Sequence, residues 1–187
     1  MKATLQNPVQ AETILDFWFT ELSPRQHYAK DAALDEAIRT RFGTTLEAAA
    51  RCELFAWRAT PEGRLAEILV LDQFSRNVYR DTPRAFAQDA LALVLAQELV
   101  GSGRDRSLPV AQRSFAYMPY MHSESALVHA QAVSLFSQPG MEDNLRFELH
   151  HKAIVDRFGR YPHRNAILGR SSTAQELAFL SEPGSSF

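Results

Sequence analysis

The 187-residue chain contains a single cysteine, Cys52. One cysteine cannot form a disulfide within a chain, and it cannot supply the several thiolates of a Cys-based zinc site. Cys52 lies in an alanine-rich stretch with helical character, so we expect it to be a small buried residue rather than a catalytic thiol. The sequence thus excludes a disulfide framework and a Cys-rich zinc fold.

Long hydrophobic runs are missing as well. The longest uncharged apolar run, residues 90–97, is far too short to span a bilayer. Near the N-terminus, Asp16 interrupts the apolar residues around Ile14 and Phe17, so we expect no secretory signal segment. The sequence therefore predicts a cytoplasmic protein without membrane association.

Lysine is scarce, with 3 residues against 17 arginines. The net charge of -2 and the pI near 6.3 argue against a surface built for nucleic acid or for acidic membranes. The arginine excess has two interpretations. It reflects a genome rich in arginine codons, or several arginines are kept for bidentate pairing with carboxylates or phosphates.

No alternating apolar and polar pattern of useful length predicts a β-strand, whereas helix signals run along most of the chain. Thr60-Pro61 and Thr82-Pro83 each place an N-cap residue before a proline at the first helical position. Thr173 and Glu176 have the spacing of a capping box. The expected helices cover residues 8–19, 31–43, 45–54, 61–79, 83–101, 122–136, 142–158 and 173–180, with a shorter interrupted segment at 107–119 and a break at Gly43.

The short connections between these segments predict antiparallel helix neighbours. Residues 92–97 and 126–131 differ at one position and lie 34 residues apart, which is the length of a tetratricopeptide repeat. No third copy follows. We therefore expect a single all-α domain over residues 1–187, with about eight helices in antiparallel hairpins that stack as a tetratricopeptide-like array.

The expected helix over residues 61–79 carries charges on an apolar face. Leu65, Ile68 and Leu69 form one stripe, and Asp72 and Arg76 fall on the same stripe. The opposite face is apolar too, which predicts a central, buried helix. An unpaired charge there costs several kcal/mol, so Asp72 and Arg76 must pair with each other, with other residues or with a ligand.

Histidines repeat this pattern farther along the chain. His122 and His129 share an apolar stripe of one expected helix, and His151 lies among Phe147, Ile154 and Phe158 on the next. The following loop, residues 159–165, is rich in donors, and its Asn165 is placed to cap the next turn. Each feature alone has a structural explanation, since core histidines, buried ion pairs and arginines at helix C-termini are common. Three helices and one loop that all break the apolar pattern favour a functional site.

Known catalytic motifs fit poorly. His122-Ser123-Glu124 contains the His-x-Glu element of zinc deaminases, but no Pro-Cys-x-x-Cys follows. The phosphate-binding, zinc-protease and nucleophile-elbow motifs are also missing. His122, Glu124, His151 and His163 form a conceivable metal set, but these residues are scattered in the sequence. We predict no metal and no cofactor.

Three sequence blocks can be compared with a family. The sequence of residues 71–77 is Leu-Asp-Gln-Phe-Ser-Arg-Asn, and that of residues 117–124 is Tyr-Met-Pro-Tyr-Met-His-Ser-Glu. Residues 158–165 are Phe-Gly-Arg-Tyr-Pro-His-Arg-Asn, followed by Leu-Gly-Arg at 168–170. Because these blocks occur in this order, together with the aromatic cluster at 17–19, the chain resembles the domain-of-unknown-function 924 family over almost its whole length.

This resemblance implies an all-helical, tetratricopeptide-like fold and no established activity. The histidines at 129 and 151 rest on helical geometry rather than on the motifs. The family motifs map onto Asp72, Arg76, Asn77, His122, Glu124, Arg160, His163, Arg164, Asn165 and Arg170. With His151 added, these residues are the candidate ligand-binding set, and we expect the motifs to meet in one polar cluster.

Three functions remain open for this set. The first is a helical binding module whose arginine-, histidine- and asparagine-lined site holds a small anion or an acidic peptide group. The second is a metal-independent hydrolase, with Glu124 or a histidine as general base and arginines that stabilise an oxyanion. The third is a structural protein with a buried polar network and no ligand. The fold alone does not decide between them.

Overall fold

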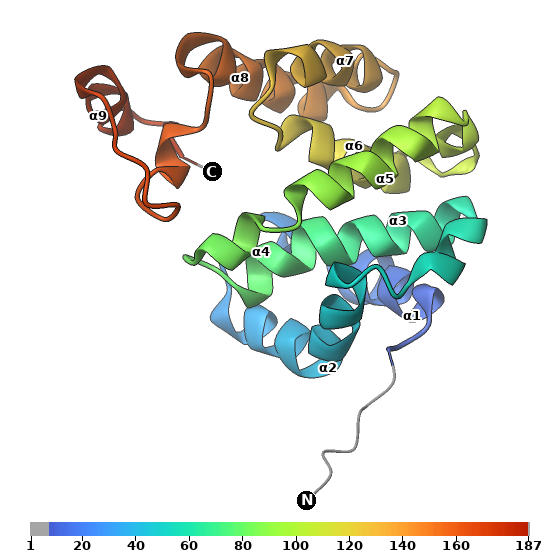
Figure 1. Cartoon of the computed structure of the whole chain (residues 1–187). Helices are drawn as coiled ribbons and strands as arrows, with labels where there is room; N and C mark the ends of the chain where they lie inside the picture. Colours follow the sequence, from blue (N-terminus) through green and yellow to red (C-terminus); the bar gives the residue numbers. More distant parts are fainter. Residues whose placement is uncertain (1–7, 187) are drawn as a thin grey trace, which may run out of the picture. The chain divides into compact units, whose positions relative to one another are not determined.

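The computed structural model describes residues 8–186, and no strand occurs among them. Figure 1 shows the helices along the chain. They are α1 (Ala11–Asp16), α2 (Ala32–Ala50), α3 (Pro61–Leu69), α4 (Ser75–Val78), α5 (Asp89–Gly101), α6 (Val110–Met121), α7 (Ala126–Phe136), α8 (Glu142–Phe158) and α9 (Ala174–Leu180). Because the π-helical turn Val70–Phe74 joins α3 and α4 without interruption, the described residues contain eight separate helices. The prediction of an all-α protein is confirmed.

The chain divides into two compact units. Among the described residues, unit 1 holds 8–80 and 84–119, and unit 2 holds 81–83 and 120–186. The division falls inside α6, directly after Pro119, which we expected to end this segment and which instead lies within the helix. The single domain over residues 1–187 and the stacked array of hairpins stay predictions.

The helix formed by α3, the π-helical turn and α4 is the centre of unit 1, where it packs against α1, α2 and α5. The side chains of Leu65, Ile68, Leu69 and Phe74 are fully buried. The start of α3 follows the sequence signals, since Pro61 takes the first helical position and the Thr60 hydroxyl accepts a hydrogen bond from the backbone N–H of residue 63. The prediction of a central, two-sided apolar helix is confirmed.

The expected helix boundaries at Gly43 and after Pro83 are wrong. Helix α2 continues through Gly43, because a glycine inside a helix costs only about 1 kcal/mol and the adjacent Phe42 and Leu46 are buried. The segment opened by Pro83 forms a 3-10 helix, Pro83–Phe86, and the backbone at Gln88 leaves the helical region before α5 begins.

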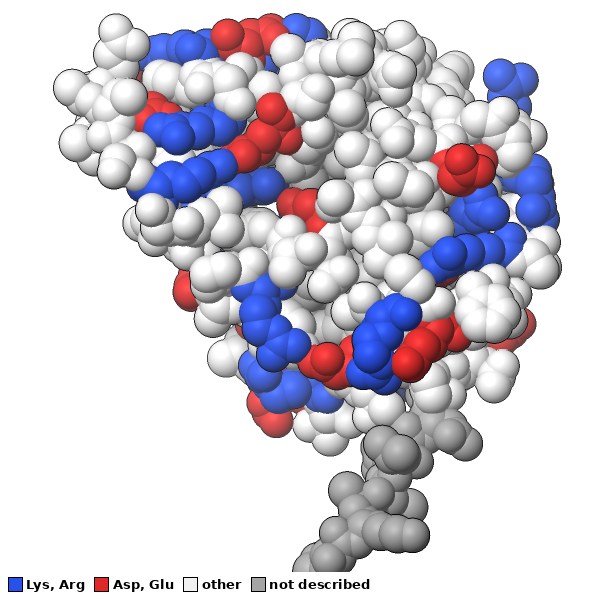
Figure 2. Space-filling view, in the orientation of Figure 1, with Lys and Arg blue, Asp and Glu red and all other residues white. Residues whose placement is uncertain are grey.

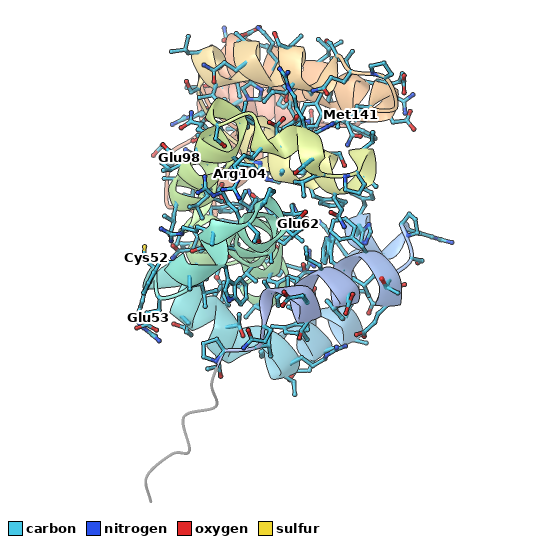
Figure 3. The ribbon with its side chains drawn as sticks, turned by 90° about the vertical axis from the view of Figure 1, so that its right-hand side faces the viewer. Cys52, Glu53, Glu62, Glu98, Arg104 and Met141 are labelled. Carbon is cyan, nitrogen blue, oxygen red and sulfur yellow. The ribbon has the colours of Figure 1, made fainter. Side chains whose placement is uncertain are left out.

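Cys52 is exposed, contrary to our expectation of a buried residue. Helix α2 ends at Ala50, so Cys52 lies in the turn that follows, where its φ of 59° is in the left-handed region. Figure 3 shows the Cys52 side chain at the surface, close to Glu53. The alanine-rich pattern placed Cys52 inside a helix and missed this turn.

In unit 2, α7 and α8 pack side by side (Figure 1). Ile154 and Val155 of α8 form a small core with Tyr161 and Phe179. Helix α8 ends at Phe158 and is followed by Gly159, whose φ is 69°, and α9 begins with the expected capping box. Among the described residues, no helix is long and apolar enough to cross a membrane.

Candidate functional site

The first motif forms an ion-pair cluster within unit 1. Asp72 is 1% exposed, and its Oδ1 lies 3.1 Å from Nη1 of Arg76. The Arg76 side chain, 20% exposed, also binds Asp89 through both terminal nitrogens, at 2.9 and 3.0 Å. The predicted burial of Asp72 and Arg76 is confirmed, and one arginine serves two carboxylates.

Asn77 belongs to a second cluster, built around Asp35 of α2. The amide of Asn77 donates to Asp35 Oδ1 at 2.7 Å, and Arg80 binds both carboxylate oxygens at 2.6 and 2.7 Å. Burial opposes ionisation of Asp35, but the hydrogen bonds from Arg80 and Asn77 outweigh it and lower the pKa of this carboxyl. These contacts fasten α2 to the end of the central helix.

Glu124, in the second motif, is the centre of a network in unit 2. Both of its oxygens bind Arg170, at 2.6 and 2.9 Å, and Oε1 also accepts a hydrogen bond of 2.8 Å from the backbone N–H of Tyr161. Burial opposes ionisation of Glu124, but these donors prevail and its pKa is lowered. The network ties the connection between α6 and α7 to the loop after α8.

Asn165 and Arg170 hold this loop in shape. Arg170 Nε donates to the side-chain oxygen of Asn165 at 3.0 Å, and the Asn165 amide donates to Ser172 Oγ at 3.0 Å. The turn itself is closed by the backbone, because the carbonyl of Asn165 accepts a 2.8 Å bond from the N–H of Arg170. Asn165 was expected to cap this turn with its side chain, and it instead positions Arg170.

Arg160 joins the same loop to α9. Its guanidinium binds both oxygens of Glu176, at 2.7 and 2.9 Å, and donates to the carbonyl of Ser171 at 2.9 Å. The Arg160 guanidinium, together with the backbone N–H of Thr173, lowers the pKa of Glu176 to about 2. Arg160 and Arg170 thus each carry a dedicated carboxylate partner.

The remaining motif residues lie around Tyr161. Arg164 donates to the carbonyl of His122 at 3.0 Å, and its guanidinium carbon lies 4.6 Å from the centre of the Tyr161 ring. The His163 ring lies 5.6 Å from the same ring. The second and third motifs therefore meet in unit 2. The first motif lies in unit 1, so the single cluster of all three stays a prediction.

His122 and His129 do not share a helix, because α7 begins at Ala126 and His122 lies in the connection before it. His129 is fully buried, and its Nδ1 lies 2.6 Å from Oε1 of Glu148, which is also fully buried. Its Nε2 lies 2.9 Å from the Ser123 carbonyl, which only accepts, so Nε2 carries a hydrogen. One further proton lies in the hydrogen bond between His129 Nδ1 and Glu148 Oε1. On His129 it gives an imidazolium beside a carboxylate, and on Glu148 it gives two neutral groups. The net charge of the pair is zero in both cases.

Glu148 was missed by the sequence reasoning. Burial raises the pKa of its carboxyl, and its Oε2 has no hydrogen-bond partner within residues 8–186. The signal was present in the spacing, because Glu148 lies three residues before His151 on the buried face of α8, which continues to Ile154. We assigned Phe147 to that face, and it is 54% exposed.

His151 is buried, and its Nδ1 lies 2.8 Å from the carbonyl of Phe147. Since a carbonyl only accepts, Nδ1 carries the hydrogen of the neutral ring. Burial lowers the pKa of His151 to about 3, so the ring is uncharged at neutral pH. As a general base it is therefore weak, and so is Glu124 with its arginine partner.

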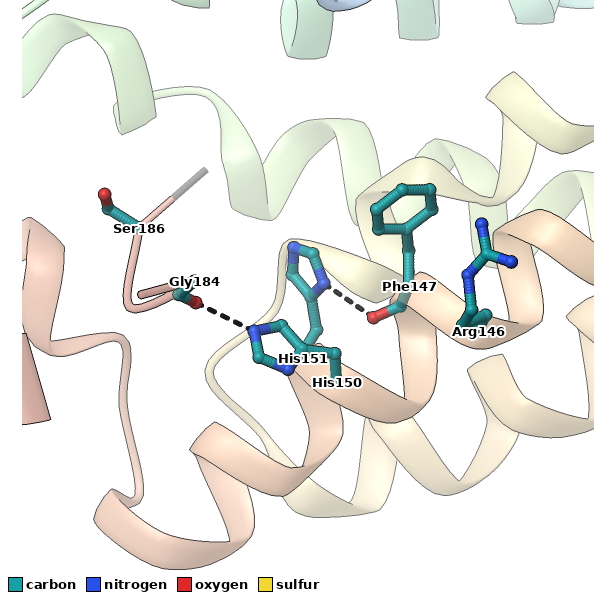
Figure 4. Close-up of a pocket in the computed structure, with 6 residues that line it drawn as sticks. All are labelled: Arg146, Phe147, His150, His151, Gly184 and Ser186. Atoms are coloured by element: carbon teal, nitrogen blue, oxygen red, sulfur yellow. Dashed lines mark hydrogen bonds between the residues drawn. The ribbon is translucent and has the colours of Figure 1, made fainter. Parts of the chain in front are cut away.

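A pocket of about 350 Å³ lies along α8, and His151 is part of its wall. Figure 4 shows the lining residues, and a dashed line marks the hydrogen bond between His150 Nε2 and the carbonyl of Gly184. This bond is 2.8 Å long. None of the described lining residues carries a carboxylate side chain. The lining residues are Arg146, Phe147, His150, His151, Gly184 and Ser186.

The candidate metal ligands are not gathered. Among residues 8–186, no group of three or more histidine, cysteine, aspartate or glutamate side chains is placed to hold a metal ion. His122, Glu124, His151 and His163 thus do not form such a group. The prediction that the protein uses no metal and no cofactor stays a prediction.

Arginine–carboxylate pairing extends beyond the motifs. Figure 2 shows blue and red side chains next to each other at several places on one face. Arg58 binds both oxygens of the buried Glu67 at 2.7 Å, and Arg84 binds Glu47 at 2.7 Å. The arginine excess was explained either by a genome rich in arginine codons or by pairing with acidic groups. These arginines do pair with carboxylates.

A family model for bacterial proteins of unknown function, DUF924, matches residues 14–184. The chain belongs to this family. The DUF924 chain is also similar to a solved structure, "Structure of Protein of Unknown Function ATU0120 from Agrobacterium tumefaciens". The two are 39% identical over 91% of this chain and 96% of the other, with a TM-score of 0.87. No curated protein matches. The comparisons thus establish the family of this DUF924 protein but assign no function to it. A function has to be inferred from the geometry of the structure.

Loss of the Arg170 guanidinium should destabilise the protein by about 2 kcal/mol, because Glu124 would stay half-buried with the Tyr161 N–H as its remaining hydrogen-bond donor among the described residues. Urea unfolding of Arg170→Met measures this change. Arg51→Met is the matched control, since the Arg51–Glu53 pair is exposed and solvent screening should leave it with little effect on stability. Equal stability changes in the two variants would show that the loop network contributes nothing beyond a surface pair.

Proposed function

We propose that this DUF924 protein is a helical binding module for a small anion or an acidic peptide group, and that the ligand occupies the pocket along α8. The observation that carries the proposal is the composition of the pocket. Arg146 supplies a permanent positive charge, and none of the described lining residues supplies a carboxylate. A volume of about 350 Å³ is at the small end of the range for ligand pockets.

The motif arginines support this site without forming it. Arg160 and Arg170 each bind a glutamate through two hydrogen bonds, so an anion would have to displace a well-placed carboxylate. Their role in the proposal is to hold the loop after α8. Arg146 differs, because its side chain is 72% exposed and its contact with Asp143, at 3.1 Å, is a weak surface pair.

The two alternative functions have less support. A hydrolase needs a base with a pKa near neutrality, whereas the pKa values of Glu124 and His151 are both lowered. A purely structural network explains the contacts of Glu124, Asn165 and Arg170 and gives no account of the pocket. The tetratricopeptide-like stacking of hairpins is part of the proposal, with the packed pair of α7 and α8 as its support.

Binding of acetate to Arg146 should raise the melting temperature of the protein. At an acetate concentration tenfold above the dissociation constant, mass action stabilises the folded state by about 1.4 kcal/mol, or roughly 3 °C. Differential scanning fluorimetry at constant ionic strength, with chloride replaced by acetate, measures this shift. Arg146→Met should abolish it and Arg51→Met should retain it. An undiminished shift in Arg146→Met would refute the pocket as the binding site.

A further inference from the structure

The proposed pocket has an apolar wall next to its cation. The guanidinium carbon of Arg146 lies 5.6 Å from the centre of the Phe147 ring, and Phe147 is 54% exposed. Figure 4 shows the two side chains extending in the same direction from α8. Water in contact with an exposed ring is released when an apolar group covers it, which favours binding.

Resting on the proposed function, we infer that the pocket binds a carboxylate joined to an apolar group rather than an inorganic anion. A carboxylate on the Arg146 guanidinium forms hydrogen bonds of about 2.8 Å. An apolar group on the Phe147 ring lies within about 4 Å of its carbons. Because the ring centre is 5.6 Å from the guanidinium carbon, one ligand with a short spacer between acid and apolar group reaches both.

The charge of the site also favours a monoanion. His151 is neutral at neutral pH and its Nδ1–H is bound to the carbonyl of Phe147, so its ring adds no permanent charge. Arg146 has Asp143 at 3.1 Å. A single, partly balanced guanidinium matches one carboxylate better than the double charge of hydrogen phosphate, which would also leave Phe147 uncovered.

A free hydrophobic acid and the C-terminus of a peptide with an apolar last residue share this chemistry. The first two of three probes compare these two sources, and the third tests the charge of the peptide terminus. The first is 3-phenylpropionate, the second is an N-acetylated tripeptide that ends in phenylalanine with a free carboxylate, and the third is the same peptide with a C-terminal amide. The amide removes the charge and keeps the ring, so it should bind at least tenfold more weakly than the acid.

The test is an NMR titration of the ¹⁵N-labelled full chain with acetate, phosphate and 3-phenylpropionate. We expect 3-phenylpropionate to bind at least tenfold more tightly than acetate or phosphate. Phe147→Ala should reduce this preference to about twofold, and Arg146→Met should remove carboxylate binding. Leu149→Ala is the matched control, because Leu149 is 50% exposed on α8 and does not line the pocket.

The outcomes separate the two proposals. Equal binding of acetate and 3-phenylpropionate that depends on Arg146 and not on Phe147 would overturn the inference and leave the proposed function intact. Tighter binding of phosphate than of 3-phenylpropionate would do the same. Absence of all anion binding, or binding unaffected by Arg146→Met, would overturn both. Because Phe147 and Arg146 are exposed, circular dichroism should show unchanged helix content in both variants.

Discussion

Replacing Gly63 with alanine should destabilise the protein by about 3 kcal/mol. A Cβ at this position would lie 2.1 Å from the backbone oxygen of Trp57 and 2.9 Å from its carbonyl carbon. Both contacts are with backbone, which cannot rotate away as a side chain can. The segment before α3 or the helix start itself would have to move, and the hydrogen bond from the Gly63 N–H to Thr60 would be strained.

Gly43→Ala is the matched control for this prediction. Gly43 also lies inside a helix, but a Cβ there meets no atom of the described residues within 4 Å. Alanine should therefore stabilise α2 by about 0.5–1 kcal/mol through its better helix propensity. Chemical unfolding of both variants gives the comparison. If Gly63→Ala is as stable as Gly43→Ala, the close approach of Trp57 to α3 is not a feature of the folded protein.

The helices could be predicted where local signals decide them. Thr60 and Pro61 start α3, and Asp31 accepts hydrogen bonds from the first N–H groups of α2. The boundaries failed where tertiary contacts override such signals. Gly43 does not end α2, because the burial of Phe42 and Leu46 outweighs a modest propensity cost.

The candidate site was predictable only in part. Helical spacing correctly placed Asp72 and His129 in buried positions and Arg76 in a mostly buried one. It could not give their partners, because Glu148 and Asp89 come from other helices and sequence spacing carries no information on such contacts. The pocket was not predicted either, since its wall combines α8 with the segment around Gly184.

Low pH should reduce the stability of the folded protein because His151 is buried in its neutral form. Its pKa is about 3 in the folded protein against an ordinary value of 6.5, chiefly because burial penalises the charged ring. The unfolded chain therefore binds a proton that the folded chain does not. The contribution of His151 to stability is present above pH 6.5 and is lost as the pH falls towards 3, about 5 kcal/mol in total.

His151→Asn isolates this effect. An asparagine amide can donate to the carbonyl of Phe147 much as the imidazole Nδ1 does, and it does not titrate. Between pH 7.5 and pH 4.5 the wild-type protein should lose about 2–3 kcal/mol more than the variant, since roughly two pH units of the window lie below the ordinary pKa. Urea unfolding at a series of pH values measures the difference.

His150→Asn is the control for the acid experiment. His150 precedes His151 in the chain and is exposed, so the stability of this variant should keep the steep wild-type dependence on pH. Glu124 and Glu176 have lowered pKa values, so their contributions to the stability of the fold are lost only below about pH 4.5. Both residues are present in all three proteins. A His151→Asn profile that parallels the wild type would mean that the folded protein accommodates a charged imidazole on α8. The wall of the pocket would then become positively charged in acid, and anion binding should strengthen as the pH falls.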